Sequence, residues 1–196
     1  MAEYGVAKFA LPGEGESGDQ HLVCCNGSGI LVAAIDGIGH GAEAANAARA
    51  AIDVLKNGSG EPIISLVVAC HEKLRATRGV VLSIASVDIR HGLMTWLGVG
   101  NVHGVLVRAD KKLAQETLML RGGVVGDHLP ALQAAVLPVG QGDMLVFATD
   151  GVRTDFTATL SPLENPQRAA DRILKGFSNG NDDALVLALR VTGIHP

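Results

Sequence analysis

The stretch that most constrains the fold is Leu31–Gly41, which reads LVAAIDGIGHG. Its first five residues are apolar and uncharged, which is typical of a strand buried on both faces. The run ends at Asp36, whose carboxylate must stay hydrated, be paired or bind a cation, because an isolated buried charge is costly. The glycines that follow let the backbone approach whatever Asp36 binds. The sequence therefore predicts a buried strand with an acidic site at its end.

The same design occurs once more towards the C-terminus, and a third acidic point follows it. Leu145–Gly151 reads LVFATDG, so a second apolar run leads directly into an acidic residue, Asp150. Asp182 and Asp183 precede a third apolar run, Ala184–Leu189. Three acidic points at strand ends suggest a site for a hard divalent cation, because such ions prefer oxygen ligands.

Composition narrows the class of protein. A chain of 196 residues favours a single domain, residues 1–196, and the 3% aromatic content requires a core of Val, Leu, Ile and Ala. Sixteen Lys and Arg against 20 Asp and Glu give a net charge of −4, which argues against a nucleic-acid surface. The odd cysteine count, the lack of a signal-peptide pattern and the lack of a membrane-spanning apolar run lead us to expect a cytoplasmic protein. The sequence does not give the oligomeric state, for which a monomer is favoured.

Hydrophobic periodicity predicts an α+β protein with a largely antiparallel sheet content. The Asn26–Gly29 loop predicts a hairpin between two of the strands. Strands are predicted at Gly5–Ala10, His21–Cys25, Ile30–Ile35, Val80–Ile89, Leu93–Val99, Val102–Arg108, Leu113–Leu120, Ala135–Leu137, Met144–Thr149 and Ala184–Val191. Helices are predicted at Gly41–Leu55, Glu61–Thr77 and Asn165–Lys175.

Five motifs, taken in their order along the chain, resemble the metal-dependent protein phosphatases of the PPM, or type 2C, family. The resemblance extends from about residue 7 to residue 191, and the Gly-Ile-Gly-His-Gly segment after Asp36 is similar to the bacterial stress and sporulation regulators. It implies a four-layer αββα sandwich of two antiparallel sheets, with a helix pair outside each. The motifs are Ser17–Asp19, Asp36–Gly41, Gly98–Asn101, Gly142-Asp143 with Ala148–Gly151, and Asn181–Asp183.

The resemblance also implies a centre of two divalent ions, Mn²⁺ or Mg²⁺. In it Asp36 bridges the ions, the carbonyl of Gly37 ligates one of them, and Asp150 and Asp182 complete the other. Asp19 stands where the family has an acidic residue that binds metal or its waters. A metal-activated water then attacks the phosphorus, and the metals stabilise the oxygens. The implied catalytic residues are Asp36 and Asp150, together with His40.

Several site residues have a second interpretation. Asp19 is also compatible with a plain turn. Asp182 is the predicted ligand from its position, and its neighbour Asp183 is the alternative. His40 either contacts phosphate, acts as a general acid, or packs at the helix start. Asn101 replaces an aspartate that many members link to a third ion, so two ions are expected. The glycine-rich segment 122–126 lacks the residues of a phosphate-binding loop and is predicted to be a turn.

The resemblance implies a serine/threonine phosphoprotein phosphatase. Its stress-regulator branch implies phosphorylated STAS-domain stressosome proteins as substrates. Only Arg153–Asn165 separates Gly151 from the third predicted helix, which leaves little room for a flap and suggests an open site suited to a protein substrate. Two alternatives remain open: a non-catalytic phosphoprotein-binding module on the same fold, and a phosphoesterase that acts on small molecules.

Overall fold

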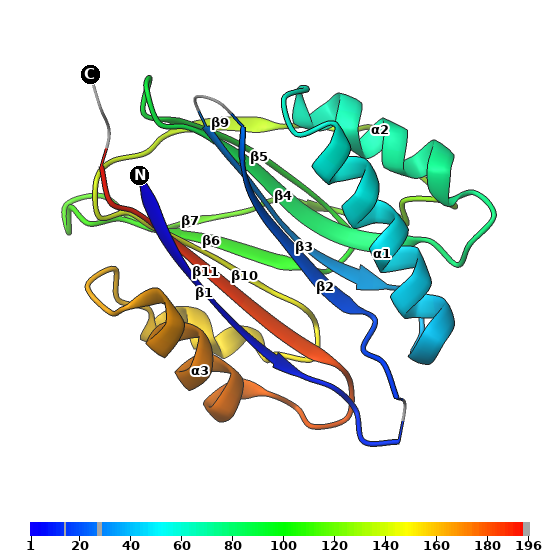
Figure 1. The fold of residues 1–196 in the computed structure, drawn as a ribbon. Coiled ribbons are helices and arrows are strands. Elements are labelled where there is room, and N and C mark those ends of the chain that lie inside the picture. Colours follow the sequence, from blue (N-terminus) through cyan, green and yellow to red (C-terminus); the bar gives the residue numbers. More distant parts are fainter. Residues whose placement is uncertain (14, 27–28, 194–196) are drawn as a thin grey trace.

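Two β-sheets pack face to face, and helices cover both outer faces (Figure 1). The computed structural model describes residues 1–13, 15–26 and 29–193. The first sheet has the order β1 (Ala2–Phe9), β11 (Ala184–Val191), β10 (Met144–Ala148), β6 (His103–Val107) and β7 (Glu116–Thr117). The second sheet has the order β2 (Asp19–Asn26), β3 (Gly29–Gly37), β4 (Val80–Asp88), β5 (Leu93–Val99) and β8 (Leu120–Arg121), with β9 (Ala135–Pro138) also paired to β5.

Three apolar clusters separate four layers, so the predicted sandwich is confirmed. One cluster joins the second sheet to α1 (Gly41–Asn57) and α2 (Ile63–Leu74), and another lies between the two sheets. The third joins the first sheet to α3 (Pro166–Phe177) and the 3₁₀ segment η1 (Thr154–Thr159). The first sheet thus carries one α-helix and a 3₁₀ segment rather than the implied pair of α-helices.

The apolar run of β3 shows why the sequence forms this sandwich. Leu31–Ile35 is completely buried, as predicted for a strand covered on both faces. Its side chains alternate: Leu31, Ala33 and Ile35 face the helices, whereas Val32 and Ala34 face the other sheet. The same alternation directs Asp36, two residues beyond Ala34, towards the space between the sheets.

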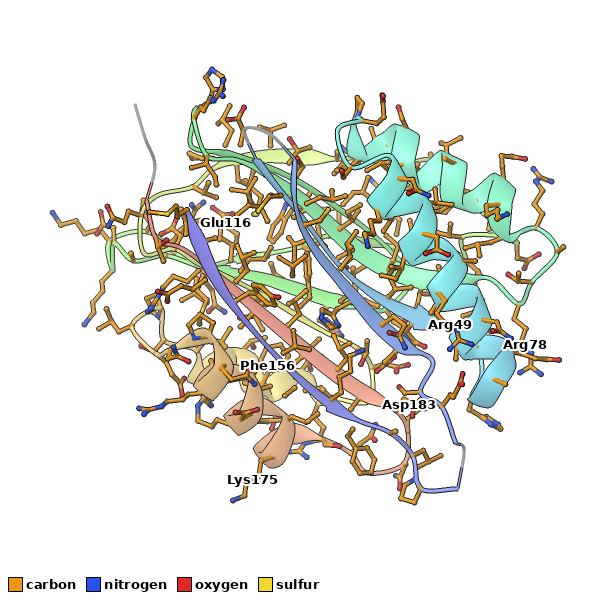
Figure 2. All side chains as sticks on the ribbon, viewed as in Figure 1. Arg49, Arg78, Glu116, Phe156, Lys175 and Asp183 are labelled. Carbon is orange, nitrogen blue, oxygen red and sulfur yellow. The ribbon has the colours of Figure 1, made fainter. Side chains whose placement is uncertain are left out.

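Two segments differ from the prediction. Leu113–Leu120 does not form one strand, because the chain crosses here from the first sheet, where β7 pairs with β6, to the second, where β8 pairs with β5. The β5–β8 pairing is parallel, so the second sheet is mixed rather than purely antiparallel. The segment before α3 contains η1, which was not predicted and which is anchored by the fully buried Phe156 (Figure 2).

The remaining predicted elements occur with boundary shifts of a few residues. β2 and β3 pair antiparallel, as the hairpin prediction requires, although Gly27 and Ser28 of the hairpin loop lie outside the described residues. Within the described chain, no helix combines the length and apolar character needed to cross a membrane.

Close approach of the chain at Gly151 brings the end of β10 against the start of β11. A methyl group at Gly151 would overlap the backbone carbonyl of Asp183. We expect Gly151→Ala to lower the free energy of unfolding by about 1–3 kcal/mol, because one of the two strands must move. Gly176→Ala, in α3 with open space around it, is the matched control and is expected to be neutral or slightly stabilising. Equal stabilities of the two variants in urea titrations would contradict this assignment.

Candidate metal centre

One pocket of about 320 Å³ brings together acidic residues from three distant parts of the chain. It lies where β3 and β10 end and β11 begins. Asp36, Asp150 and Asp182 all line it, as does Asn101, which follows β5. The other lining residues are Ile38, Gly39, His40, Val81, Gly100 and Gly122.

Glycines permit the close contacts that position these side chains. A methyl group at Gly37 would overlap the backbone of Ala44, so α1 lies directly against the end of β3. Gly100 has a φ of +92°, a conformation that residues with a Cβ rarely adopt. The turn that it forms directs Asn101 into the pocket, where the Asn101 Nδ2 donates a hydrogen bond of 2.7 Å to Asp150 Oδ2.

Carboxylates are crowded at this end of the sandwich. Asp19 lies directly opposite Asp36 in the β2–β3 pairing, so the two side chains share a face of the sheet. Burial and the nearby charges of Asp19, Asp150 and Asp182 raise the pKa of Asp36 to about 8. Burial, together with Asp182, also raises the pKa of Asp150, although the hydrogen bond from Asn101 opposes that shift. A bound cation would relieve this repulsion.

Two predicted ligand residues, Asp19 and Gly37, do not line the pocket and lie next to Asp36 instead. Asp19 is buried, and its Oδ2 accepts a hydrogen bond of 2.7 Å from Thr149 Oγ1. This bond joins the two sheets, because Asp19 is in β2 and Thr149 follows β10. Burial raises the pKa of Asp19 to about 7 even though the Thr149 bond lowers it. Gly37 donates its N–H to the carbonyl of Gly18 at 3.2 Å.

The structure separates Asp182 from its neighbour Asp183. Asp182 is exposed and lines the pocket. Asp183 is buried, and its two oxygens accept backbone hydrogen bonds from Leu11 at 2.8 Å and Gly18 at 2.7 Å. Asp183 thus ties the segment between β1 and β2 to the start of β11 (Figure 2).

His40 is exposed at the rim of the pocket. It is the N-cap residue of α1, and its side chain makes no capping hydrogen bond to the helix. The position leaves its imidazole beside the space where a substrate would enter. This location is compatible with the phosphate-contact and general-acid interpretations of His40.

Gly122 is a wall residue that sequence reasoning did not assign to the site. The segment 122–126 is held against β4 by the paired backbones of Val80 and Val125, with Val80 N–H to Val125 O at 2.9 Å. That pairing brings Gly122 to the pocket. Since Gly122 offers only backbone, its side chain carries no chemical signal that could have identified it.

The donor set fits Mg²⁺ or Mn²⁺ better than zinc, because it consists of carboxylate, amide and backbone oxygens. Among the residues that the structure describes, no three His, Cys, Asp or Glu side chains converge closely enough to hold an ion by themselves. Mg²⁺ in proteins is commonly bound by only one or two carboxylates and keeps several waters. The site therefore suits ions that keep part of their water shell.

Comparison with known proteins identifies the fold. A chain from the structure described as "The bacterial stressosome: a modular system that has been adapted to control secondary messenger signaling" superimposes with a TM-score of 0.88. It is 30% identical, and the alignment covers 97% of this chain and 100% of that one. RsbX in complex with magnesium gives a TM-score of 0.87 at 19% identity, covering 97% and 96% of the two chains. The fold is that of the PPM, or PP2C, phosphatases.

Sequence comparison then gives the family. The family described as Stage II sporulation protein E (SpoIIE) matches residues 26–192, and the chain belongs to this family. A curated relative, phosphoserine phosphatase RsbX of Bacillus subtilis (strain 168), is 28% identical over 100 residues. That match spans half of this chain and half of the relative.

The different environments of the two adjacent aspartates predict different effects of substitution. Asp183→Ala leaves the buried N–H of Gly18 and the partly buried N–H of Leu11 without their acceptor, so we expect the free energy of unfolding to fall by about 1–3 kcal/mol. Asp182→Ala, in the exposed neighbour, removes one of the repelling carboxylates, so it should leave the stability of the metal-free protein unchanged or raise it slightly, and it should weaken Mg²⁺ binding. Thermal unfolding and calorimetric Mg²⁺ titration measure the two effects. Loss of stability only in the Asp182 variant would reverse the assignment.

Carboxylate crowding predicts a pH-dependent stability of the metal-free protein. The folded-state pKa of Asp36, about 8, lies above its unfolded value of roughly 4, so the folded state binds more protons between these values. The stability of EDTA-treated protein should therefore fall as pH rises from 5 to 8, with Tm decreasing by several degrees. Asp36→Asn should flatten this decrease, and Mg²⁺ should raise Tm at pH 8. A Tm that rises over the same interval in EDTA would contradict the expectation.

Proposed function

We propose that the protein is a metal-dependent serine/threonine phosphoprotein phosphatase and that residues 1–196 form one phosphatase domain. The observation that carries the proposal is the meeting of Asp36, Asp150 and Asp182, which come from segments far apart in the sequence, around one pocket. Membership of the SpoIIE family and the PPM fold support the same activity.

Two divalent ions, Mg²⁺ or Mn²⁺, complete the proposed site. Asp36, the Gly37 carbonyl, Asp150 and Asp182 would hold these ions. Asp19, buried beside Asp36, would hold a ligand or a coordinated water. When bound, such ions activate a water for in-line attack on phosphorus and neutralise charge on the phosphoryl oxygens.

Side chains of this protein orient the acidic groups. The Asn101 amide fixes one oxygen of Asp150, which leaves the other oxygen for a ligand role. The Thr149 hydroxyl fixes Asp19 in the same way. Attack on phosphorus releases the serine or threonine oxygen of the substrate, and this oxygen must acquire a proton. His40, at the rim, is the proposed donor of that proton or a contact to the phosphate.

For the substrate we infer phosphorylated STAS-domain proteins of the stressosome, encountered in the cytoplasm. The relatives support this class of partner: one is a phosphoserine phosphatase, and another was solved in the context of the bacterial stressosome. The position of the pocket at the surface, with Asp150, Asp182 and His40 exposed, suits a phosphoserine presented by a folded protein.

Metal-dependent hydrolysis tests the proposal. We expect phosphate release from a phosphoserine STAS-domain protein with Mn²⁺ and none with EDTA. Asp36→Asn and Asp150→Asn should each lower kcat by about 100-fold or more, because a ligand of the ions loses its charge. Asp53→Asn, at an exposed position of α1, is the matched control and should keep full activity.

The same experiment separates the alternatives. Full activity in either ligand variant would exclude the proposed centre. Metal binding without any turnover would favour a binding module, and faster hydrolysis of a nucleotide than of the phosphoprotein would favour a small-molecule phosphoesterase.

A further inference from the structure

The side chains that line the pocket carry negative charge, although the proposed substrate group, a phosphate ester, is also negative. Three carboxylates line the pocket, and none of its lining residues in the described chain is a lysine or an arginine. A phosphate monoester is a dianion near neutral pH, and a cation at the rim would add charge-assisted hydrogen bonds to those of the metal centre.

Arg78 lies against Gly39, one residue of the pocket wall. It belongs to the connection between α2 and β4, and its guanidinium is next to the backbone of Gly39. A Cβ built on Gly39 would be only 2.6 Å from Arg78 Nη1. Gly39 itself lines the pocket, so the guanidinium is next to a residue of the pocket wall. Figure 2 shows Arg78 beside the N-terminal end of α1.

The present partner of Arg78 does not hold it strongly. Arg78 forms an ion pair with Glu43 in the first turn of α1, and the two side chains are 48% and 69% exposed. Exposed ion pairs contribute little stability, so an incoming phosphate can compete with Glu43 for the guanidinium. Arg78 also borders an open groove of about 320 Å³, formed with Asn46 and Thr77 among others, which gives the side chain space to turn.

Two other cations near the site form hydrogen bonds to other groups. The Lys8 ammonium donates to the Asp19 carbonyl and to Gln20 Oε1, both at 3.3 Å. Arg121 precedes the wall residue Gly122, but its guanidinium is hydrogen-bonded to Gln133 and lines a separate groove. Arg78 is therefore the cation best placed to reach a phosphate in the pocket.

We propose that Arg78 is a substrate-binding residue that contacts the phosphoryl oxygens of the phosphoprotein. A guanidinium presents a planar pair of N–H donors that matches two phosphate oxygens, which a lysine does not reproduce. The identity of the substrate as a phosphoprotein rests on the proposed function, whereas the contact to phosphate does not.

Calorimetric binding of inorganic phosphate to the Mg²⁺-loaded protein tests the contact directly. Arg78→Gln should weaken phosphate binding by about tenfold, because a charge-assisted hydrogen bond is lost, and Arg78→Lys should have an intermediate effect. Arg75→Gln removes the same charge from an exposed ion pair with Glu72 on α2 and is the matched control. It should bind phosphate within about twofold of the native protein.

Two further measurements make the outcome specific. Glu43→Gln releases Arg78 from its partner and should strengthen phosphate binding, and Mg²⁺ affinity should be unchanged in all four variants. Phosphate binding by Arg78→Gln that equals that of Arg75→Gln would overturn the proposal, as would an absence of phosphate binding by the native protein.

Kinetics separate this inference from the proposed function. With a phosphoserine protein as substrate, Arg78→Gln should raise KM more than it lowers kcat. If the native protein binds phosphate through Arg78 but hydrolyses no phosphoprotein, then the proposed function fails while the assignment of Arg78 stands.

Discussion

Repulsion between neighbouring carboxylates, of which Asp19 is buried and Asp36 half-buried, is the constraint on which the site depends. Asp36 and Asp19 lie opposite each other on neighbouring strands, and Asp150 and Asp182 approach from the ends of the other sheet. Burial and mutual repulsion raise the pKa values of Asp19 and Asp36 to about 7 and about 8. A fold that holds several acids so close together is under strain until a cation, or protons, reduces the charge.

Rigid packing around the acids makes this arrangement possible. β3 and β10 are buried on both faces, so the strands cannot move apart to separate the charges. Glycines at positions 37 and 151 allow backbones to touch where any side chain would push them apart. The Thr149–Asp19 bond adds a direct link between the sheets beside the site. The packing of the two sheets therefore holds the carboxylates close together in spite of their mutual repulsion.

The hydrophobic pattern of the sequence predicted strands and helices correctly where a segment has a continuous apolar run or a regular apolar face. The strand through Leu31–Ile35 and the three helices occur close to their predicted positions, because apolar runs and small-residue faces have few alternative structures. Prediction failed at Leu113–Leu120, where the chain changes sheets, and before α3, where one buried side chain, Phe156, organises η1. Neither feature produces a period that a local window can detect.

The sequence by itself determined which carboxylates stand at strand ends and, through the order of its motifs, the family resemblance. Only the tertiary structure decided where each of them lies. Asp182 lines the pocket, whereas the adjacent Asp183 accepts hydrogen bonds from the backbone N–H groups of Leu11 and Gly18. The tertiary structure also brought Gly122 into the wall and Arg78 against Gly39. Such contacts join residues that are distant in the sequence, and the direction of each side chain depends on packing that no local pattern specifies.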